Sequence, residues 1–124
     1  MRILIVDDSS MMRAMIKRVV AIADVPVADI CEAGNGAEAL AILNTRDVQI
    51  LLTDINMPVM TGIELLREVA KDDRWADLVR VVVSTDGSSS RRAEVAGLGV
   101  RCYLEKPFSP EVMRDVLSEA ARIA

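Results

Sequence analysis

Two adjacent aspartates, Asp7 and Asp8, end an apolar run near the start of the chain, and two serines follow them. Neighbouring carboxylates repel each other when they are removed from water, so water, a helix N-terminus or a cation must compensate their charge. Aspartate is a common N-cap residue, and Asp8 as the cap of the following helix is therefore one interpretation. The other interpretation needs partners from elsewhere in the sequence.

Further polar residues directly follow or end apolar runs later in the chain: Asp54, Ser84, Thr85 and Lys106. If these runs are parallel strands, their carboxyl ends form one rim of the sheet and the polar residues gather around one crevice. One aspartate after a strand is easily explained by a turn or a cap, but the whole set on one rim is not. We therefore expect a site with three carboxylates, a pair of hydroxyls and an ammonium group.

The chemistry of such a site follows from its charges. Clustered carboxylates raise one another's pKa unless a hard cation lies between them, and oxygen ligands with room for water suit Mg²⁺. We expect Asp7 and Asp8 to hold this ion, while Asp54, alone at a central strand end, attacks a phosphorus atom to form an acyl phosphate. Three groups are expected to hold the phosphoryl oxygens: the Lys106 ammonium, the Ser84 hydroxyl and the Thr85 backbone N–H.

The elements that position these residues are predicted from hydrophobic periodicity. Short β-branched runs alternate with stretches of helical period, which is typical of an α/β fold with a parallel sheet. The predicted strands are residues 3–6, 27–31, 50–53, 79–83 and 100–104. The predicted helices are residues 12–23, after a Ser9/Ser10 cap, 37–43, 63–70, 88–96 and 112–120. Right-handed crossovers then give a doubly wound sheet of five strands with five helices.

Length and composition fit one domain over residues 1–124, because 52% hydrophobic residues are enough for a continuous core. The net charge of −4 lacks the basic surplus of a nucleic-acid or membrane-surface binder. No apolar run is long enough to span a membrane and no signal-peptide pattern is present, so we expect a cytoplasmic protein. The absence of histidine excludes a histidine general acid or base.

The sulfur-containing residues are expected in the core. Cys31 and Cys102 lie among apolar neighbours in predicted strands, with no CxxC motif and no histidine to complete a zinc site. Buried, reduced thiols are the simplest interpretation. The seven methionines, three of them in the first helix, are likewise expected to fill the core.

The segment 33–39, AlaGlyAsnGlyAlaGluAla, matches a G-x-G-x-x-A dinucleotide fingerprint, with Asp54 about twenty residues further on. The match lies in the second βα unit, after a strand expected at the sheet edge, whereas the fingerprint belongs beside the point where the strand order reverses. We therefore interpret this segment as a turn that starts a helix.

Four segments together resemble the receiver domain of two-component response regulators: IVDDS at 5–9, LTDINMPVMTG at 52–62, VVVST at 81–85 and YLEKPF at 103–108. The resemblance spans essentially the whole chain. The opening VDDSSMMRAMIK and the short length are most similar to the free-standing chemotaxis (CheY-like) type. The resemblance implies a flavodoxin-like receiver fold with strand order 2-1-3-4-5.

The resemblance also implies roles for the residues of the rim. Asp54 matches the phosphoryl acceptor, and Asp7 and Asp8 match the acidic pair that binds Mg²⁺. The backbone carbonyl of Asn56 completes the metal shell in this family. Lys106 matches the invariant lysine.

Ser84 matches the switch hydroxyl and Tyr103 the switch aromatic, and the family has a cis peptide bond before the residue that matches Pro107. Thr85 is a departure, because alanine is frequent at this position, and its bulk narrows access to an acyl phosphate. Phosphorylation would draw Ser84 towards the phosphoryl group and let the Tyr103 ring fill the vacated space. The segment 85–99, rich in serine and glycine, is expected to be of low stability.

The altered surface would comprise the fourth helix, the fifth strand and the fifth helix. The implied partners are a histidine kinase and a downstream protein target at this face, such as the flagellar motor switch, with no nucleic acid or membrane. Grouping of Tyr103 and Phe108 around Lys106 would fit this role, and core packing of both rings is the alternative. The chain is expected to be a monomeric signalling module and not an enzyme.

Three other functions stay open. A phosphorelay carrier and a receiver excised from a longer regulator share the same fold and chemistry. A phosphohydrolase of the haloacid dehalogenase type also uses a strand-end aspartate with Mg²⁺, but that family needs a second aspartate where this chain has Asn56.

Overall fold

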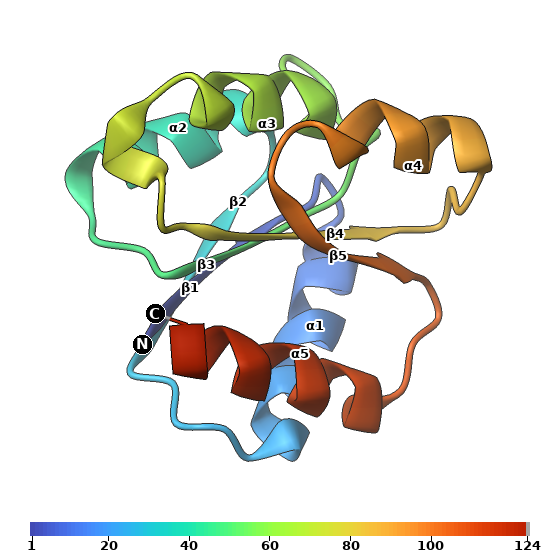
Figure 1. The fold of residues 1–124 in the computed structure, drawn as a ribbon. Coiled ribbons are helices and arrows are strands. Elements are labelled where there is room, and N and C mark those ends of the chain that lie inside the picture. The colour runs from blue at the N-terminus through green and yellow to red at the C-terminus, as the bar shows by residue number, and fades with distance from the viewer. Residues whose placement is uncertain (124) are drawn as a thin grey trace.

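The computed structural model describes residues 1–123, which form a sheet between two layers of helices (Figure 1). The strands are β1 (Arg2–Val6), β2 (Asp29–Ala33), β3 (Ile50–Thr53), β4 (Val79–Ser84) and β5 (Val100–Glu105). The helices are α1 (Ser10–Ala23), α2 (Gly36–Thr45), α3 (Gly62–Ala70), α4 (Ser89–Ala96) and α5 (Pro110–Ile123), with a 3-10 turn, η1 (Asp73–Trp75).

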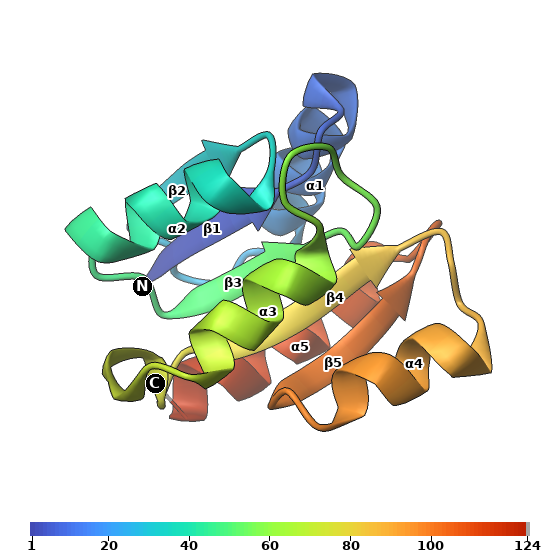
Figure 2. The same ribbon diagram turned by 90° about the horizontal axis from the view of Figure 1, so that it is seen from above.

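All strand pairs are parallel, and their order is β2-β1-β3-β4-β5 (Figure 2). The chain leaves β1 to form β2 on one side and then returns to form β3 on the other side, so the strand order reverses between β1 and β3. Helices α2, α3 and α4 cover one face of the sheet, and α1 and α5 cover the other (Figure 1). The doubly wound α/β fold and the strand order expected from the sequence are confirmed.

The central strands are apolar throughout because both of their faces are covered. In β1, Ile3 and Ile5 belong to the core layer beneath α1 and α5, whereas Leu4 and Val6 belong to the layer beneath α2, α3 and α4. All four side chains are buried. Alternate side chains of β1 therefore pack against the two helical layers on opposite faces of the sheet.

Each of the first four helices starts after a side chain that accepts a hydrogen bond from the backbone N–H three residues on: Ser9, Asn35, Thr61 and Ser88. Ser9 rather than Asp8 caps α1, so the capping interpretation of Asp8 is wrong. The cap by Asn35 confirms that the glycine-containing segment before α2 is a helix-starting turn.

Two local predictions are corrected. Strand β2 covers 29–33 and not 27–31, because the parallel register pairs Arg2 at the start of β1 with Asp29. The turn η1 was not predicted; its N-cap Asp72 accepts a hydrogen bond from the Arg74 backbone N–H at 2.9 Å, a local contact with no hydrophobic period.

The sulfur-containing residues are less buried than expected. Cys31 and Cys102 are free thiols, as predicted, but both are partly exposed because β2 and β5 are the edge strands. Met113 is in the core, whereas Met11 and Met15 on α1 are 78% and 53% exposed. The prediction that the methionines fill the core is therefore wrong for Met11 and Met15, whereas Met12 packs against the core beneath α1 and α5.

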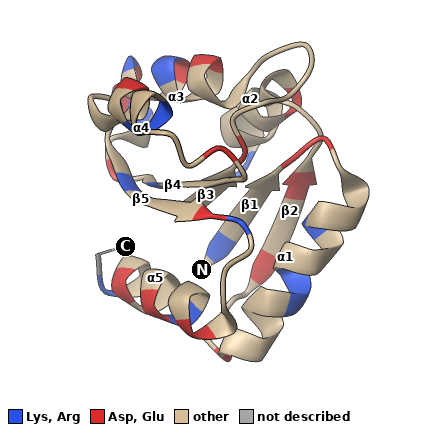
Figure 3. Cartoon of the chain, turned by 90° about the vertical axis from the view of Figure 1, so that its right-hand side faces the viewer, with Lys and Arg blue, Asp and Glu red and all other residues tan. Residues whose placement is uncertain are grey.

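No helix within residues 1–123 combines the length and the apolar character that a bilayer crossing requires. Acidic and basic positions are interspersed along α3, α4 and α5 (Figure 3).

Candidate functional site

The polar residues expected at the rim lie at the ends of the strands or just beyond them, and backbone pairing holds them there. The N–H groups of Asp7, Asp54 and Lys106 each donate to a carbonyl at the end of a neighbouring strand, at 3.1, 2.9 and 2.8 Å. The parallel ladders thus continue one residue past β1, β3 and β5. Because all three strands end at the same edge of the sheet, the three side chains meet there.

Three carboxylates and one ammonium form the centre of the site. One oxygen each of Asp7, Asp8 and Asp54 can be chosen so that all lie within 4.8 Å of one another. The Lys106 Nζ donates to Asp7 Oδ2 at 2.8 Å and to Asp54 Oδ2 at 3.4 Å. Asp7 is buried, Asp54 is partly exposed and Asp8 is exposed. One ammonium does not neutralise three carboxylates, so the cluster is suited to a divalent cation.

Backbone donors orient the two inner carboxylates. The Ile55 N–H donates to Asp54 Oδ1 at 2.7 Å, and the Ser9 N–H donates to Asp7 Oδ1 at 2.9 Å. Each of these carboxylates therefore has one oxygen on a backbone N–H and the other on Lys106. Such fixed orientation is what a metal ligand or a nucleophile needs.

The loop between Asp54 and α3 is closely packed. The Gly62 N–H donates to the Ile55 carbonyl at 2.8 Å, and a Cβ at Gly62 would lie 1.9 Å from the Asp54 carbonyl oxygen. Asn56 is exposed in this loop. Val59 has a φ of 67°, a left-handed conformation that is strained for a β-branched residue.

Ser84 and Tyr103 are joined through Asp86, a residue that the sequence analysis did not identify. The Asp86 N–H donates to Ser84 Oγ at 3.1 Å, and the Tyr103 hydroxyl donates to the Asp86 carbonyl. Hydrogen bonds from Ser88, and then the Arg91 guanidinium, hold the pKa of Asp86 below its ordinary value. One residue of the β4–α4 loop therefore contacts both switch candidates and α4.

Tyr103 and Phe108 do not form one group. Tyr103 packs against the core layer beneath α2, α3 and α4, whereas Phe108 packs against the layer beneath α1 and α5. Burial, followed by the charge of Asp86, raises the pKa of Tyr103. The Arg92 guanidinium lies 4.4 Å from the centre of the Tyr103 ring. The two rings thus lie on opposite faces of the sheet, which corrects the expected grouping.

Phe108 lines an apolar hollow of about 280 Å³ beside the acidic cluster. Met12 and Met15 of α1 and the exposed Thr85 also line this hollow. The peptide bond between Lys106 and Pro107 is cis, as the resemblance implied.

Arg13 is a second residue that the sequence analysis missed. Its Nη1 donates to the Asp7 carbonyl at 2.6 Å and its Nε to Glu32 Oε1 at 3.0 Å. It therefore ties the first turn of α1 to β2 behind the acidic cluster. The sequence feature that could have identified Arg13 is its place one helical turn after Ser9, the N-cap of α1.

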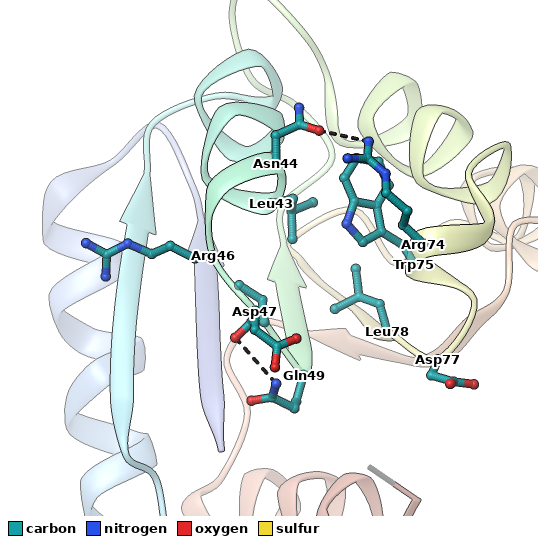
Figure 4. Close-up of a pocket in the computed structure, with 10 residues that line it drawn as sticks. Leu43, Asn44, Arg46, Asp47, Gln49, Arg74, Trp75, Asp77 and Leu78 are labelled. Atoms are coloured by element: carbon teal, nitrogen blue, oxygen red, sulfur yellow. Dashed lines mark hydrogen bonds between the residues drawn. The ribbon is translucent and has the colours of Figure 1, made fainter.

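Another hollow, of about 410 Å³, lies at the amino ends of β3 and β4 (Figure 4). Leu43, Leu78 and Trp75 line it, and Arg74 lies over the Trp75 ring and donates to Asn44 Oδ1 at 2.8 Å. Ligands of doubly wound folds bind at the other end of the sheet. The acidic cluster is therefore the candidate site.

The family of the chain follows from comparison with known proteins. A model of the response regulator receiver domain matches residues 3–118. The chain belongs to the family of response regulator receiver domains.

Its relatives define the type of receiver more closely. The chain is 39% identical over 119 residues to the chemotaxis protein CheY of Pseudomonas aeruginosa, covering 96% of this chain and 94% of that protein. It is 37% identical over 120 residues to a chemotaxis protein CheY homolog of Campylobacter jejuni, covering 96% and 91%. The structure of the chemotaxis response regulator CheY4 of Vibrio cholerae aligns with a TM-score of 0.80 at 29% identity, covering 99% of this chain and 98% of that chain. The chain is thus a receiver domain of the CheY type.

Proposed function

We propose that this chain, as one receiver domain over residues 1–124, is a phospho-acceptor switch that takes a phosphoryl group from a histidine kinase onto Asp54. The observation that carries the proposal is the setting of this carboxylate. One Asp54 oxygen is held by a backbone N–H at 2.7 Å, the other lies 3.4 Å from Lys106 Nζ, and the side chain is still 15% exposed. Asp54 is oriented and accessible, as a nucleophile must be.

In the proposed reaction, an Asp54 oxygen attacks the phosphorus of a phosphohistidine. The new P–O bond forms as the P–N bond breaks, and the electron pair of that bond leaves with the imidazole. Lys106, the Ser84 hydroxyl and the Thr85 backbone N–H stabilise the negative charge on the phosphoryl oxygens. The proximity of Lys106 to Asp54 and the place of Ser84 at the end of β4 support these roles.

The all-oxygen ligand set supports Mg²⁺ as the cofactor. Asp7, Asp8 and Asp54, with the backbone carbonyl of Asn56, would hold the ion beside the phosphoryl group. When bound, it supplies positive charge that offsets both the carboxylates and the phosphoryl oxygens.

The proposed output is a change of the surface formed by α4, β5 and α5. A phosphoryl group on Asp54 attracts the Ser84 hydroxyl, which breaks its contact with the Asp86 N–H and frees Tyr103 to reorient. The downstream partner is a protein, and the chemotaxis relatives favour the flagellar motor switch. The mixed charge of α4 and α5 supports a protein partner over nucleic acid (Figure 3).

In this role the chain is a monomeric cytoplasmic signalling module. Its chemistry is confined to its own phosphorylation and dephosphorylation, and it does not act as an enzyme on other substrates.

The test is the intact mass of the protein after incubation with acetyl phosphate, with and without Mg²⁺. We expect one phosphoryl adduct that requires Mg²⁺ and disappears in Asp54→Asn. Asp77→Asn, an exposed aspartate at the other end of the sheet, is the matched control and should keep the adduct.

An adduct retained by Asp54→Asn would contradict the assignment of the acceptor. If wild type gives no adduct, binding of beryllofluoride with Mg²⁺ decides, because this phosphoryl mimic does not depend on the lifetime of an acyl phosphate. Absence of both would contradict the proposed function.

A further inference from the structure

Arg80 is a buried cation that forms no ion pair with an acidic side chain among residues 1–123. It lies in β4, the strand that ends at Ser84, and is only 8% exposed. Its Nε is buried and has no hydrogen-bond partner within the described part of the chain, and burial lowers the pKa of the guanidinium. A charge in this environment is costly unless it makes specific contacts. The same anomaly is visible in the sequence, as one arginine in the strand ValArgValValVal.

Arg80 donates hydrogen bonds to two backbone carbonyls, one in η1 and one in the turn after α4. Its Nη2 donates to the carbonyl of Trp75, the last residue of η1, at 2.7 Å. Its Nη1 donates at 3.2 Å to the carbonyl of Leu98, in the turn that follows α4. Hydrogen bonds to these two carbonyl oxygens offset part of the free-energy cost of burying the guanidinium. Arginine holds the two carbonyls with two separate nitrogens, whereas the single nitrogen of a lysine would have to lie within hydrogen-bond distance of both.

The backbone beside Arg80 is shaped to admit its side chain. Gly99 has a φ of 76°, and a Cβ there would lie 2.1 Å from Arg80 Nη1. The β4–β5 register shifts at the same place, so that Arg80 pairs with Val100 but Val81 pairs with Cys102. The turn after α4 and the start of β5 therefore fit around the guanidinium.

Helix α4 depends on such polar contacts because it is poorly packed. Val95 is the one buried residue of α4 among the residues described. The N-terminal end of the helix is held by the Arg91 pair with Asp86, at 3.3 Å, next to Ser84. The C-terminal end is followed by the turn that Arg80 binds. The two ends are thus attached to different parts of β4.

We propose that Arg80 is a positioning residue that fastens the C-terminal end of α4 to β4, so that α4 pivots about this end when its N-terminal end moves. The fastening does not depend on phosphorylation. The pivot rests on the proposed function, in which Ser84 and Tyr103 rearrange at the N-terminal end. Arg80 would then confine the surface change to the side of α4 nearest Asp86.

Hydrogen exchange of the unphosphorylated protein tests the fastening. Wild type is compared with Arg80→Met, which keeps the length of the side chain but loses the fork, and with Arg80→Lys, which keeps the charge. Arg101→Met is the matched control, because Arg101 lies on β5 and pairs with Glu119 on the surface. We expect peptides covering 93–99 to exchange about tenfold faster in both Arg80 variants, with α5 unchanged. Arg101→Met should leave 93–99 as in wild type.

Two results would overturn the fastening: unchanged exchange in 93–99 in either Arg80 variant, or an equal acceleration in all peptides. The second would identify Arg80 as a general stability residue. Urea unfolding of each variant separates these cases, because replacement of a buried charge by Met need not lower global stability.

The pivot is tested in wild type with beryllofluoride and Mg²⁺. We expect exchange to change in 85–92 and to stay constant in 94–98. Equal changes at both ends would overturn the pivot and leave the fastening to be judged by the variants. Absence of beryllofluoride binding would count against the proposed function and not against the fastening.

Discussion

Each carboxylate of the acidic cluster has a different set of partners. Asp7 is buried and accepts from both Lys106 and a backbone N–H, and Asp54 does the same with a longer contact to Lys106. Asp8 is exposed, and no side chain among residues 1–123 forms an ion pair with it. Asp7 therefore supports the fold as well as the site, whereas Asp8 contributes mainly negative charge.

Val59→Asn is expected to raise the free energy of unfolding by about 1 kcal/mol, because asparagine tolerates a left-handed backbone better than a β-branched residue does. Val59 is 82% exposed, so little packing is lost. Urea unfolding measures the change. The same substitution at Val112, an exposed valine within α5, should not stabilise the protein; equal effects at both positions would refute backbone strain as the cause.

Tyr103 should ionise at a higher pH in the folded protein than in the unfolded chain, because burial raises its pKa. Its contribution to stability is then fully present below the unfolded pKa of about 10 and is lost as pH rises through the folded pKa. Tyr103 is the only tyrosine, so tyrosinate absorbance follows it directly. Equal midpoints of the absorbance titration in buffer and in urea would contradict this prediction. Tyr103→Phe gives the background absorbance of a protein without tyrosine.

The loop between β3 and α3 is the element that fixes the position of Asp54. Its far end is held by a capping box, in which Thr61 and Glu64 exchange hydrogen bonds, and by the contact of Gly62 with the backbone of Asp54. The start of α3 and Asp54, the proposed phosphoryl acceptor, therefore form one packed unit. A substitution at Gly62, the first residue of α3, should therefore change the position of Asp54.

Gly62→Ala is expected to lower the free energy of unfolding by more than about 2 kcal/mol, because the new Cβ overlaps the Asp54 carbonyl and overpacking of this kind is costly. The phosphoryl adduct should also form more slowly. Gly97→Ala, where a Cβ meets no atom within 4 Å, is the control for thermal unfolding and labelling. Similar behaviour of the two variants would show that the close contact does not matter.

The sequence patterns predict elements well where one physical cause dominates. The apolar strands β3 and β4 and the amphipathic helices α1 and α5 are defined by hydrophobic period. The predicted limits of β2 were two residues too early, because they depend on pairing with β1 and a local sequence pattern contains no information on pairing. The rim residues could be predicted because parallel strands end at one edge.

Contacts that depend on side-chain direction could not be predicted in this way. Asp86 and Arg13 act through bonds to backbone groups brought close by the fold. The opposite placement of Tyr103 and Phe108 follows from the alternation of β5 and the turn after it, which moves Phe108 to the face of α1. Arg80 interrupts the apolar run of β4 in the sequence, but its burial and its two carbonyl partners depend on the fold.

For the whole molecule, cation binding and stability should be linked. A ligand that binds only the folded state raises the melting temperature, so Mg²⁺ should stabilise wild type. In a chelator, Asp8→Asn should melt higher than wild type, because it relieves repulsion among the carboxylates without removing a partner of Lys106. Circular dichroism against temperature, with and without Mg²⁺, measures both effects.

Asp7→Asn is the control in the same thermal unfolding experiment. Asp7→Asn removes the closest partner of the largely buried Lys106, so it should melt lower than wild type in the chelator. A higher melting temperature for Asp7→Asn, or a full Mg²⁺ response in Asp8→Asn, would contradict this account of the cluster.

The fluorescence of the single tryptophan reports on one end of the sheet only. Trp75 lines the hollow at the amino ends of β3 and β4 (Figure 4). Asp54 follows the carboxyl end of β3, so it lies at the opposite edge of the sheet. Its emission should therefore follow unfolding but stay almost constant while Mg²⁺ is added. A fluorophore near the acidic cluster has to be introduced by substitution. Phe108→Trp would supply one, because Phe108 lies beside Lys106 in the apolar hollow.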